Sequence, residues 1–267
     1  MTITITDTKR ISAAKPVVTS APQPITVYPI KSWSYSRLLD FESCPLKAKL
    51  KYVDKIVESS GPAAERGTMI HQLAEDFVCG KIKKLPVELV KFSDEFLALR
   101  NRFVEKAVSL EGEWGFDRDW NKSTYKDAWV RIKLDARIVK SKTHSIVVDY
   151  KTGKRFGNEV KHGEQVVLYG IAELLREPHV ESVDVELWYL DVDELISTRF
   201  TREKLLRFLP TFEKRGVKIT TATQFPPNPN LFSCKWCPYG PAKSGDCKYG
   251  VVQGDVTSIG DYRKKFK

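Results

Sequence analysis

The sequence predicts an α/β sandwich in which helices flank a mixed central β-sheet, and three observations lead to this fold class. Residues 130–139 and 145–151 are rich in β-branched side chains, which indicates two adjacent strands. Apolar residues recur at steps of three and four across 87–110, which predicts a long helix with one buried face. Residues 182–190 alternate apolar and polar side chains and follow a predicted helix at 164–176, so helices and strands interleave.

The other elements follow from the same periodicities. Ser34 is a typical N-cap for a helix that residues 41–45 interrupt before an amphipathic stretch continues to about Tyr52. The remaining predictions are a helix at 65–79, a first strand at 113–117, a strand at 196–200 and a helix at 202–220. Proline-rich residues 225–229 are expected to end regular structure.

Length and composition indicate a soluble globular protein. The 267 residues suit one sizeable domain with appendages or two small domains, and 42% hydrophobic with 29% charged residues is ordinary for this class. The sequence contains no run of about 18 apolar residues, so no membrane span is expected. Residues 1–10 contain no apolar segment typical of a secretory signal, so a cytoplasmic location is expected.

The charge balance favours polyanionic partners. Forty-four basic residues against 34 acidic ones give a formal net charge of +10. Such a balance attracts phosphates and gains from counterion release. The lysines are spread along the chain, so charge alone is a weak sign of nucleic-acid binding.

The five cysteines argue for metal ligation. An odd number in a chain without a predicted signal peptide speaks against a disulfide framework. Cys234 and Cys237 form a C-x-x-C pair, and Cys247 follows after nine residues. Thiolates at such spacing favour zinc or an iron–sulfur centre. A thioredoxin-like redox motif is the alternative, but that motif opens a helix after a strand, whereas proline- and glycine-rich loops surround this pair.

Two acids and a lysine form a candidate cation site. Asp149 and Lys151 point to one face of their predicted strand, while Tyr150 points to the other. Asp135 lies inside an apolar partner strand, where an acid is costly unless it is paired or holds a metal. Alternatively, Asp149 and Lys151 form an exposed ion pair of little value, and Asp135 faces solvent. Glu113 could approach this site from the predicted first strand, but it is more simply an exposed carboxylate.

Polar residues on two predicted helices accompany these acids. Gln165 and Tyr169 lie four residues apart and therefore share a face of the helix at 164–176. His71 and Glu75 have the same spacing on the helix at 65–79. Taken alone, His71 is more simply a partly buried histidine with satisfied hydrogen bonds.

The order of these motifs resembles the PD-(D/E)XK nuclease superfamily, specifically its RecB-like branch. An acid, then D-x-K at 149–151, then Q-x-x-x-Y at 165–169 form the core of the resemblance, and G-x-x-x-H at 67–71 precedes them. The pattern S-x-S-x-L-x-x-F-x-x-C-P at 34–45 is similar to the opening of that branch, which includes CRISPR-associated RecB-like exonucleases and phage recombination exonucleases. The resemblance spans about residues 32–249 and implies a restriction-endonuclease-like core.

The resemblance also implies roles for individual residues. Implied catalytic residues are His71, Asp135, Asp149 and Lys151; implied ligands of Mg²⁺ or Mn²⁺ are His71, Asp135, Asp149 and the carbonyl of Tyr150; implied DNA contacts are Gln165 and Tyr169. Lys151 would orient or deprotonate the attacking water. Because imidazole suits Mn²⁺ better than Mg²⁺, a manganese preference is expected.

A cysteine cluster that clasps the two ends of the domain is also implied. Its ligands would be Cys44, Cys234, Cys237 and Cys247, holding a [4Fe–4S] cluster, with Zn²⁺ or no metal as alternatives. The nine-residue spacing before Cys247 is longer than the family's. The expected organisation is a flexible N-terminal arm at 1–31, a nuclease domain at 32–250 and a basic tail at 251–267.

The expected function is a metal-dependent DNA exonuclease that acts at DNA ends in recombination or repair. Its partners would be single-stranded or duplex DNA ends and a recombination protein, in the cytoplasm of a bacterial or phage-infected cell. A DNA-binding or adaptor module that uses the fold without cutting is the main alternative. A structural iron–sulfur or zinc protein is a third hypothesis.

Overall fold

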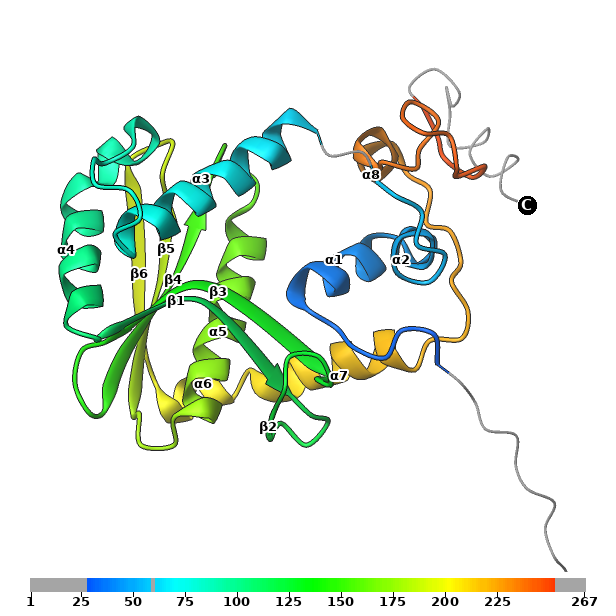
Figure 1. The fold of residues 1–267 in the computed structure, drawn as a ribbon. Coiled ribbons are helices and arrows are strands. Elements are labelled where there is room, and N and C mark those ends of the chain that lie inside the picture. The colour runs from blue at the N-terminus through cyan, green and yellow to red at the C-terminus, as the bar shows by residue number, and fades with distance from the viewer. Residues whose placement is uncertain (1–27, 59–60, 253–267) are drawn as a thin grey trace, which may run out of the picture.

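A six-stranded β-sheet lies at the centre of the computed structural model, which describes residues 28–58 and 61–252 (Figure 1). The strand order is β2-β1-β3-β4-β5-β6. β4 and β5 run parallel and the other neighbouring strands are antiparallel, so the sheet is mixed. The strands are β1 (Val108–Phe116), β2 (Lys122–Ser123), β3 (Val130–Val139), β4 (His144–Lys151), β5 (Ser182–Tyr189) and β6 (Glu194–Thr201).

Helices cover both faces of the sheet and form two cores. α5 (Glu159–Arg176) packs on one face, where α1 (Tyr35–Ser43) and α7 (Leu209–Thr220) extend the same core. α3 (Pro62–Val78) and α4 (Ser93–Val104) cover the opposite face. This two-sided cover confirms the predicted fold class. The remaining helices are α2 (Pro45–Tyr52), the 3-10 helix η1 (Val87–Phe92), α6 (Arg202–Leu206) and α8 (Leu231–Trp236).

β4 is buried on both faces because helices lie on each side of it. Val147 belongs to the α5 core, whereas Ile146 and Val148 belong to the α3–α4 core, as the alternation of a strand requires. β4 pairs in parallel with β5, and α5 supplies the crossover that a parallel pair needs. Asp149 and Lys151 follow Val147 by two and four residues, so their side chains point to the same face of the sheet, toward α5.

β1 and β3 change from one core to the other halfway along their length. Apolar residues of β3 up to Leu134 pack in the α5 core, whereas those from Ala136 onward pack beneath α3 and α4. Asp135 lies at this change. Glu111 of β1 lies between Leu110 and Gly112, which pair with the two neighbours of Asp135, and it has a left-handed φ of 46°. The sheet therefore carries acids at the boundary between its two cores.

The predicted helix at 87–110 is wrong in its C-terminal part. The helical segment consists of η1 and α4 and ends at Val104, and β1 begins at Val108. Lys106 turns the chain with a φ of 60°. The apolar stripe continues past this turn because Val108 and Leu110 pack in the same core as strand residues. The predicted first strand at 113–117 is consequently only the second part of β1.

Three further boundaries differ from the prediction. The helix expected at 202–220 is two helices, because Pro210 lies in the first turn of α7 and lacks the N–H that a continuous helix would use. α5 begins at Glu159 rather than at residue 164. Regular structure was expected to end at 225–229, but Asn230 caps α8 by accepting the Ser233 N–H at 2.8 Å.

The predicted terminal segments lie mostly outside the described residues. Of the arm expected at 1–31, the structure describes 28–31, where Ile30 is buried in the α5 core. Of the tail expected at 251–267, it describes 251–252. Both segments stay predictions.

Trp33 fastens the start of the described chain to the core. The backbone N–H of Trp33 donates to the carbonyl oxygen of Trp129 at 2.8 Å. Its ring packs edge to face against Trp120 and Trp129. α7 approaches this ring so closely that a Cβ at Gly216 would lie 2.3 Å from Trp33 Nε1. A glycine at this position lets α7 close the core.

Candidate functional site

A polar cavity of about 540 Å³ opens where α3, β3, β4 and α5 meet. Each of these elements contributes polar side chains, in contrast to the apolar cores on either side. The cavity lining includes His71 and Glu75 from α3, Asp135 from β3, Asp149 and Lys151 from β4, and Gln165 and Tyr169 from α5. The residues predicted from separate motifs therefore lie around one opening.

Asp135 makes two contacts just beyond the end of the β3–β4 ladder. The last paired residues are Ala136 and Val148. One step further, Asp135 Oδ2 accepts the Tyr150 N–H at 2.5 Å, and Oδ1 lies 2.8 Å from Nδ1 of His71. The Asp135 side chain is only 11% exposed, so these contacts supply the partners that a buried carboxylate needs.

Asp149 and Lys151 form a second contact group with α5. Nζ of Lys151 lies 2.5 Å from Oδ2 of Asp149 and donates to Oε1 of Gln165 at 2.9 Å. The amide nitrogen of Gln165 donates to the Tyr169 hydroxyl at 2.7 Å and to Oδ1 of Asp149 at 3.5 Å. Because Gln165 and Tyr169 lie one turn apart, a single face of α5 holds the lysine in place.

Tyr150 contributes its backbone to the site, while its ring points to the opposite face of the sheet. The ring packs against Phe96 and Trp188 in the α3–α4 core, with centroid distances of 5.3 and 5.5 Å. The sequence predicts that Tyr150 points to one face of β4 while Asp149 and Lys151 point to the other. This arrangement follows from the alternation of side chains along a strand.

His71, Glu111 and Asp135 form a group able to hold a metal ion. One ligand atom of each lies within 4.8 Å of the others. The β1–β3 register accounts for part of this group, since the pairs Leu110–Ala136 and Gly112–Leu134 flank Glu111 and Asp135. An imidazole and two carboxylates suit hard divalent cations, Mn²⁺ in particular. The donor set present therefore fits a divalent cation, and it contains His71 and Asp135 of the predicted ligands.

The sequence does not predict Glu111 as a site residue. The first strand was expected to start at residue 113, which left Glu111 outside any strand. Glu113 is exposed, as expected, and Glu111 forms an ion pair with Lys133 at 3.0 Å. A strand that starts at Val108 would have placed Glu111 beside Asp135. Glu111 was therefore missed because the preceding helix was predicted to continue to residue 110.

Burial and neighbouring charges shift the pKa values of Asp149 and His71. Burial raises the pKa of Asp149 to about 6; Lys151 opposes this shift and Asp135 adds to it. Burial lowers the pKa of His71, but the hydrogen bond and charge of Asp135 outweigh it and leave that pKa raised. A bound cation would favour the ionised carboxylates.

The chain after β4 is fastened to α3, which positions His71. Gly153 N–H donates to Oδ2 of Asp191 at 2.5 Å, and Asp191 accepts two bonds from Arg66 at 2.6 and 2.8 Å. A Cβ at Gly67 would lie 3.1 Å from Oγ1 of Thr152. The close approach of α3 to this loop therefore uses the glycine of the G-x-x-x-H pattern.

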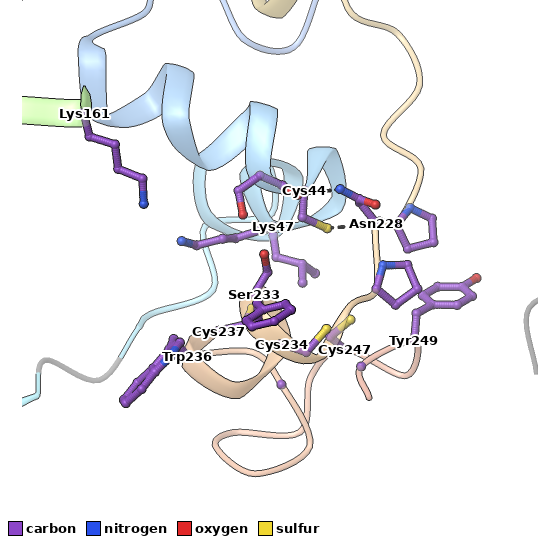
Figure 2. A pocket seen from close by; sticks show the side chains of 17 residues that line it. Cys44, Lys47, Lys161, Asn228, Ser233, Cys234, Trp236, Cys237, Cys247 and Tyr249 are labelled. Carbon is purple, nitrogen blue, oxygen red and sulfur yellow. Dashed lines mark hydrogen bonds between the residues drawn. The ribbon is translucent and has the colours of Figure 1, made fainter. Parts of the chain in front are cut away.

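Four cysteines line a second cavity of about 320 Å³ (Figure 2). They come from the α1–α2 junction, from α8 and from the loop after it: Cys44, Cys234, Cys237 and Cys247. Asn228 N–H donates to Sγ of Cys44 at 3.3 Å. Burial raises the pKa of Cys237 and of Cys247, so a bound metal would be what favours their thiolates near neutral pH. Cys79 lies apart, at the end of α3.

Two solved structures are similar to this chain at low sequence identity. SSO0001 is 15% identical over 82% of this chain and 89% of that one, with a TM-score of 0.44. An exonuclease candidate from Eubacterium rectale is 14% identical over 87% of this chain and 92% of that one, with a TM-score of 0.49. No curated protein matches the chain.

Two further findings concern the helices of the chain and the family to which it belongs. Within residues 28–58 and 61–252, no helix is long and apolar enough to cross a membrane. The model of the PD-(D/E)XK nuclease superfamily matches residues 32–242, which contain both the polar cavity and Cys44, Cys234 and Cys237. This chain belongs to the PD-(D/E)XK nuclease superfamily.

Proposed function

We propose that this chain is a divalent-metal-dependent deoxyribonuclease that hydrolyses phosphodiester bonds at DNA ends. The observation that carries the proposal is Lys151, whose Nζ lies 2.5 Å from Asp149 beside a His/Glu/Asp group able to hold a cation. Membership of the nuclease superfamily supports the reaction class. The net charge of +10 supports a polyanionic substrate.

His71, Glu111 and Asp135 would hold Mg²⁺ or Mn²⁺, together with Asp149 and the carbonyl of Tyr150. A cation bound there lowers the pKa of a coordinated water and stabilises negative charge on the phosphate. The imidazole in this set favours manganese, so a higher rate with Mn²⁺ than with Mg²⁺ is expected.

Lys151 would act on the attacking water and on the phosphate. As an ammonium group it can orient the water and screen the charge that develops in the transition state, whereas deprotonation of the water would require its neutral amine. Gln165 holds this group at 2.9 Å, and Tyr169 holds Gln165 at 2.7 Å. Because both side chains also line the cavity, we assign them contacts with the DNA backbone near the scissile phosphate.

We propose a [4Fe–4S] cluster for the four-cysteine cavity, with Zn²⁺ as the alternative. Thiolate sets select these two kinds of centre, and a cavity of about 320 Å³ has room for a polynuclear cluster. Anaerobic purification with iron, sulfide and zinc analysis decides between them. Iron with matching sulfide supports the cluster, and zinc without iron supports the alternative.

The cysteine set and the motif order support the RecB-like branch of the superfamily. On this basis we propose a role in DNA recombination or repair, in the cytoplasm of a bacterial or phage-infected cell and with a recombination protein as partner. The competing function is a DNA-binding or adaptor module that uses the fold without cutting. Such a module would retain DNA ends and leave them whole.

Linear and circular substrates test the proposal. Linear single- and double-stranded DNA, labelled at either end, is incubated with Mn²⁺, Mg²⁺ or EDTA beside covalently closed circles of the same sequence. We expect metal-dependent shortening of linear DNA, intact circles and no reaction in EDTA. Cut circles would overturn action at ends while leaving a nuclease. Linear DNA that is bound but never shortened would establish the adaptor function.

A further inference from the structure

α8 presents two large aromatic side chains to solvent beside the cysteine cavity. Phe232 is 88% exposed and Trp236 is 75% exposed. They lie four residues apart on α8, so both rings occupy one face of the helix. Figure 2 shows the Trp236 ring pointing away from the labelled cysteines. An exposed aromatic pair of this kind, with no role in either core, is typical of a binding surface.

Lysines accompany these rings. Nζ of Lys235 lies 5.2 Å from the centroid of the Trp236 ring. Lys161 of α5 and Lys47 of α2 line the same cavity as the two rings. Lys47 is paired with Asp40 at 2.6 Å, so Lys161 and Lys235 supply the uncompensated charge. Among the described residues that line this cavity there is no Asp or Glu.

Lys161 also connects this surface with the candidate active site. Lys161 and Gln165 lie four residues apart on α5, so they share a helix face and are about 6 Å apart along its axis. Gln165 contacts Lys151 in one cavity, and Lys161 lines the other cavity together with Trp236. A single strand of nucleic acid that follows this face of α5 would pass from the candidate active site to the rings of Phe232 and Trp236.

We propose that Phe232, Trp236 and Lys161 form a binding site for single-stranded nucleic acid that holds the substrate strand beyond the active site. The inference rests on the proposed nuclease function and adds a preference for unpaired strands. Aromatic rings stack on bases of any sequence, and lysines neutralise the backbone. In a duplex both faces of a base are covered by its neighbours, so the rings have nothing to stack on.

Binding measurements on the full-length Lys151→Ala protein test this site without cleavage. Dissociation constants are measured by fluorescence anisotropy for oligo-dT of increasing length and for a duplex. Phe232→Ala and Trp236→Ala should each weaken binding of a long oligo-dT about tenfold, since stacking contributes about one factor of ten or more per base. Trp236→Phe should restore most of the affinity, and the duplex constant should not change.

Salt dependence separates the two parts of the site. Lys161→Ala should lower the slope of log affinity against log salt by about 0.7, the value for one phosphate contact on a single strand. The ring variants should keep the wild-type slope. Val87→Ala and Val104→Ala remove equally exposed apolar side chains elsewhere, each 77% exposed, and serve as controls that should bind like the parent. Content of iron or zinc, whichever the parent holds, and melting temperature check that each variant is folded.

Equal dissociation constants for the ring variants and their parent would overturn this site and leave a protein partner as the ligand of the surface. Digestion of linear DNA by the wild type is assayed in parallel. If the wild type digests DNA while the ring variants bind normally, this inference fails and the proposed function stands. If the rings matter but the wild type digests nothing, the proposed nuclease fails and the binding site stands.

Discussion

At Asp135 the backbone of β4, the imidazole of His71 and the carboxylate of Glu111 converge on one side chain. The convergence depends on position within the strand, since the residues on either side of Asp135 belong to different cores. An acid at this boundary can reach a polar cavity while its neighbours stay in apolar surroundings. The position of Asp135, where β3 passes from one core to the other, therefore matters to the site as much as its residue type.

Glu111→Gln is predicted to weaken metal binding. The substitution keeps the size of the side chain and removes one of the two carboxylates in the His/Glu/Asp group. We expect Mn²⁺ affinity, measured by isothermal titration calorimetry, to fall by at least about tenfold. Glu113→Gln, two residues along the same strand and exposed, is the matched control. Equal Mn²⁺ affinity in Glu111→Gln and wild type would remove Glu111 from the metal site.

Seven of the fourteen residues that line the polar cavity were predicted as site residues from the sequence, and Glu111 was not. Asp149, Lys151, Gln165 and Tyr169 follow from short-range spacing on one strand and one helix, which local periodicity determines. Glu111 depends on where β1 starts, and that boundary was hidden because the apolar stripe of α4 runs on into the strand.

At the scale of elements, α5 is the part that connects the two cavities and the sheet. Its apolar residues pack on β4 and β5, and Gln165 and Tyr169 line the polar cavity. Near its other end, Glu173 is completely buried and forms a two-oxygen contact with Arg137 of β3, at 2.7 and 2.8 Å. This ion pair fixes the helix over the strand that carries Asp135.

Glu173→Ala is predicted to destabilise the fold strongly. The substitution leaves the Arg137 guanidinium, whose side chain is 16% exposed, with only the distant Glu177 at 3.9 Å. An uncompensated buried charge costs about 3–5 kcal/mol, which urea unfolding would measure. The double variant Arg137→Met/Glu173→Leu should recover most of the loss. A Glu173→Ala protein as stable as wild type would show that the pair does not hold α5.

The corner between α1 and α2 is predicted to be sensitive to acid. Burial would raise the pKa of Asp40, but Lys47 and the Tyr52 hydroxyl outweigh it and hold the pKa below its ordinary value of 3.8. A depressed carboxyl pKa adds stability that is complete above the unfolded value and is lost as pH falls below it.

The melting temperature of wild type should therefore exceed that of Asp40→Asn by a constant amount above about pH 5. The difference should shrink as pH falls below 3.8, where the Asp40 carboxylate takes up a proton. An unchanged difference between pH 7 and pH 3 would contradict this assignment of the Asp40 contacts.

At the scale of the whole molecule, the cysteine cavity joins segments that lie far apart in the chain. Cys44 follows the first described helix, whereas Cys234, Cys237 and Cys247 lie near the end of the described chain. The C-x-x-C spacing pointed to metal binding, and the family resemblance was needed to add Cys44. Spacing alone could not do so, because nearly 190 residues separate Cys44 from Cys234.

Cys44→Ser is predicted to open this clasp. We expect loss of visible absorbance in anaerobically purified protein and a lower melting temperature, because closing a long chain loop stabilises the folded state. Cys79→Ser is the matched control, since Cys79 lies at the end of α3 and lines neither cavity. Identical spectra and melting temperatures for Cys44→Ser, Cys79→Ser and wild type would exclude Cys44 as a ligand.

The overall fold was predictable because each layer carries its own periodicity: two-residue alternation in β5 and three- and four-residue steps in α4. What escaped prediction depended on contacts between elements. Three features that escaped prediction lie where the chain passes from one element to the next. They are the end of α4 at Val104, the break before Pro210 and the short helix α8. Such junctions leave little trace in local apolar spacing.

The central claim, that this molecule hydrolyses DNA through the Lys151 site, is tested most directly by one rate. Single-turnover digestion of an end-labelled DNA strand is measured with saturating Mn²⁺ for wild type and for Lys151→Ala, at protein concentrations that bind all of the strand. We predict that the rate falls by about 100- to 1000-fold in the variant, because an electrostatic contact made in the transition state is lost. Equal rates for the two proteins, or no digestion by folded wild type, would contradict the claim.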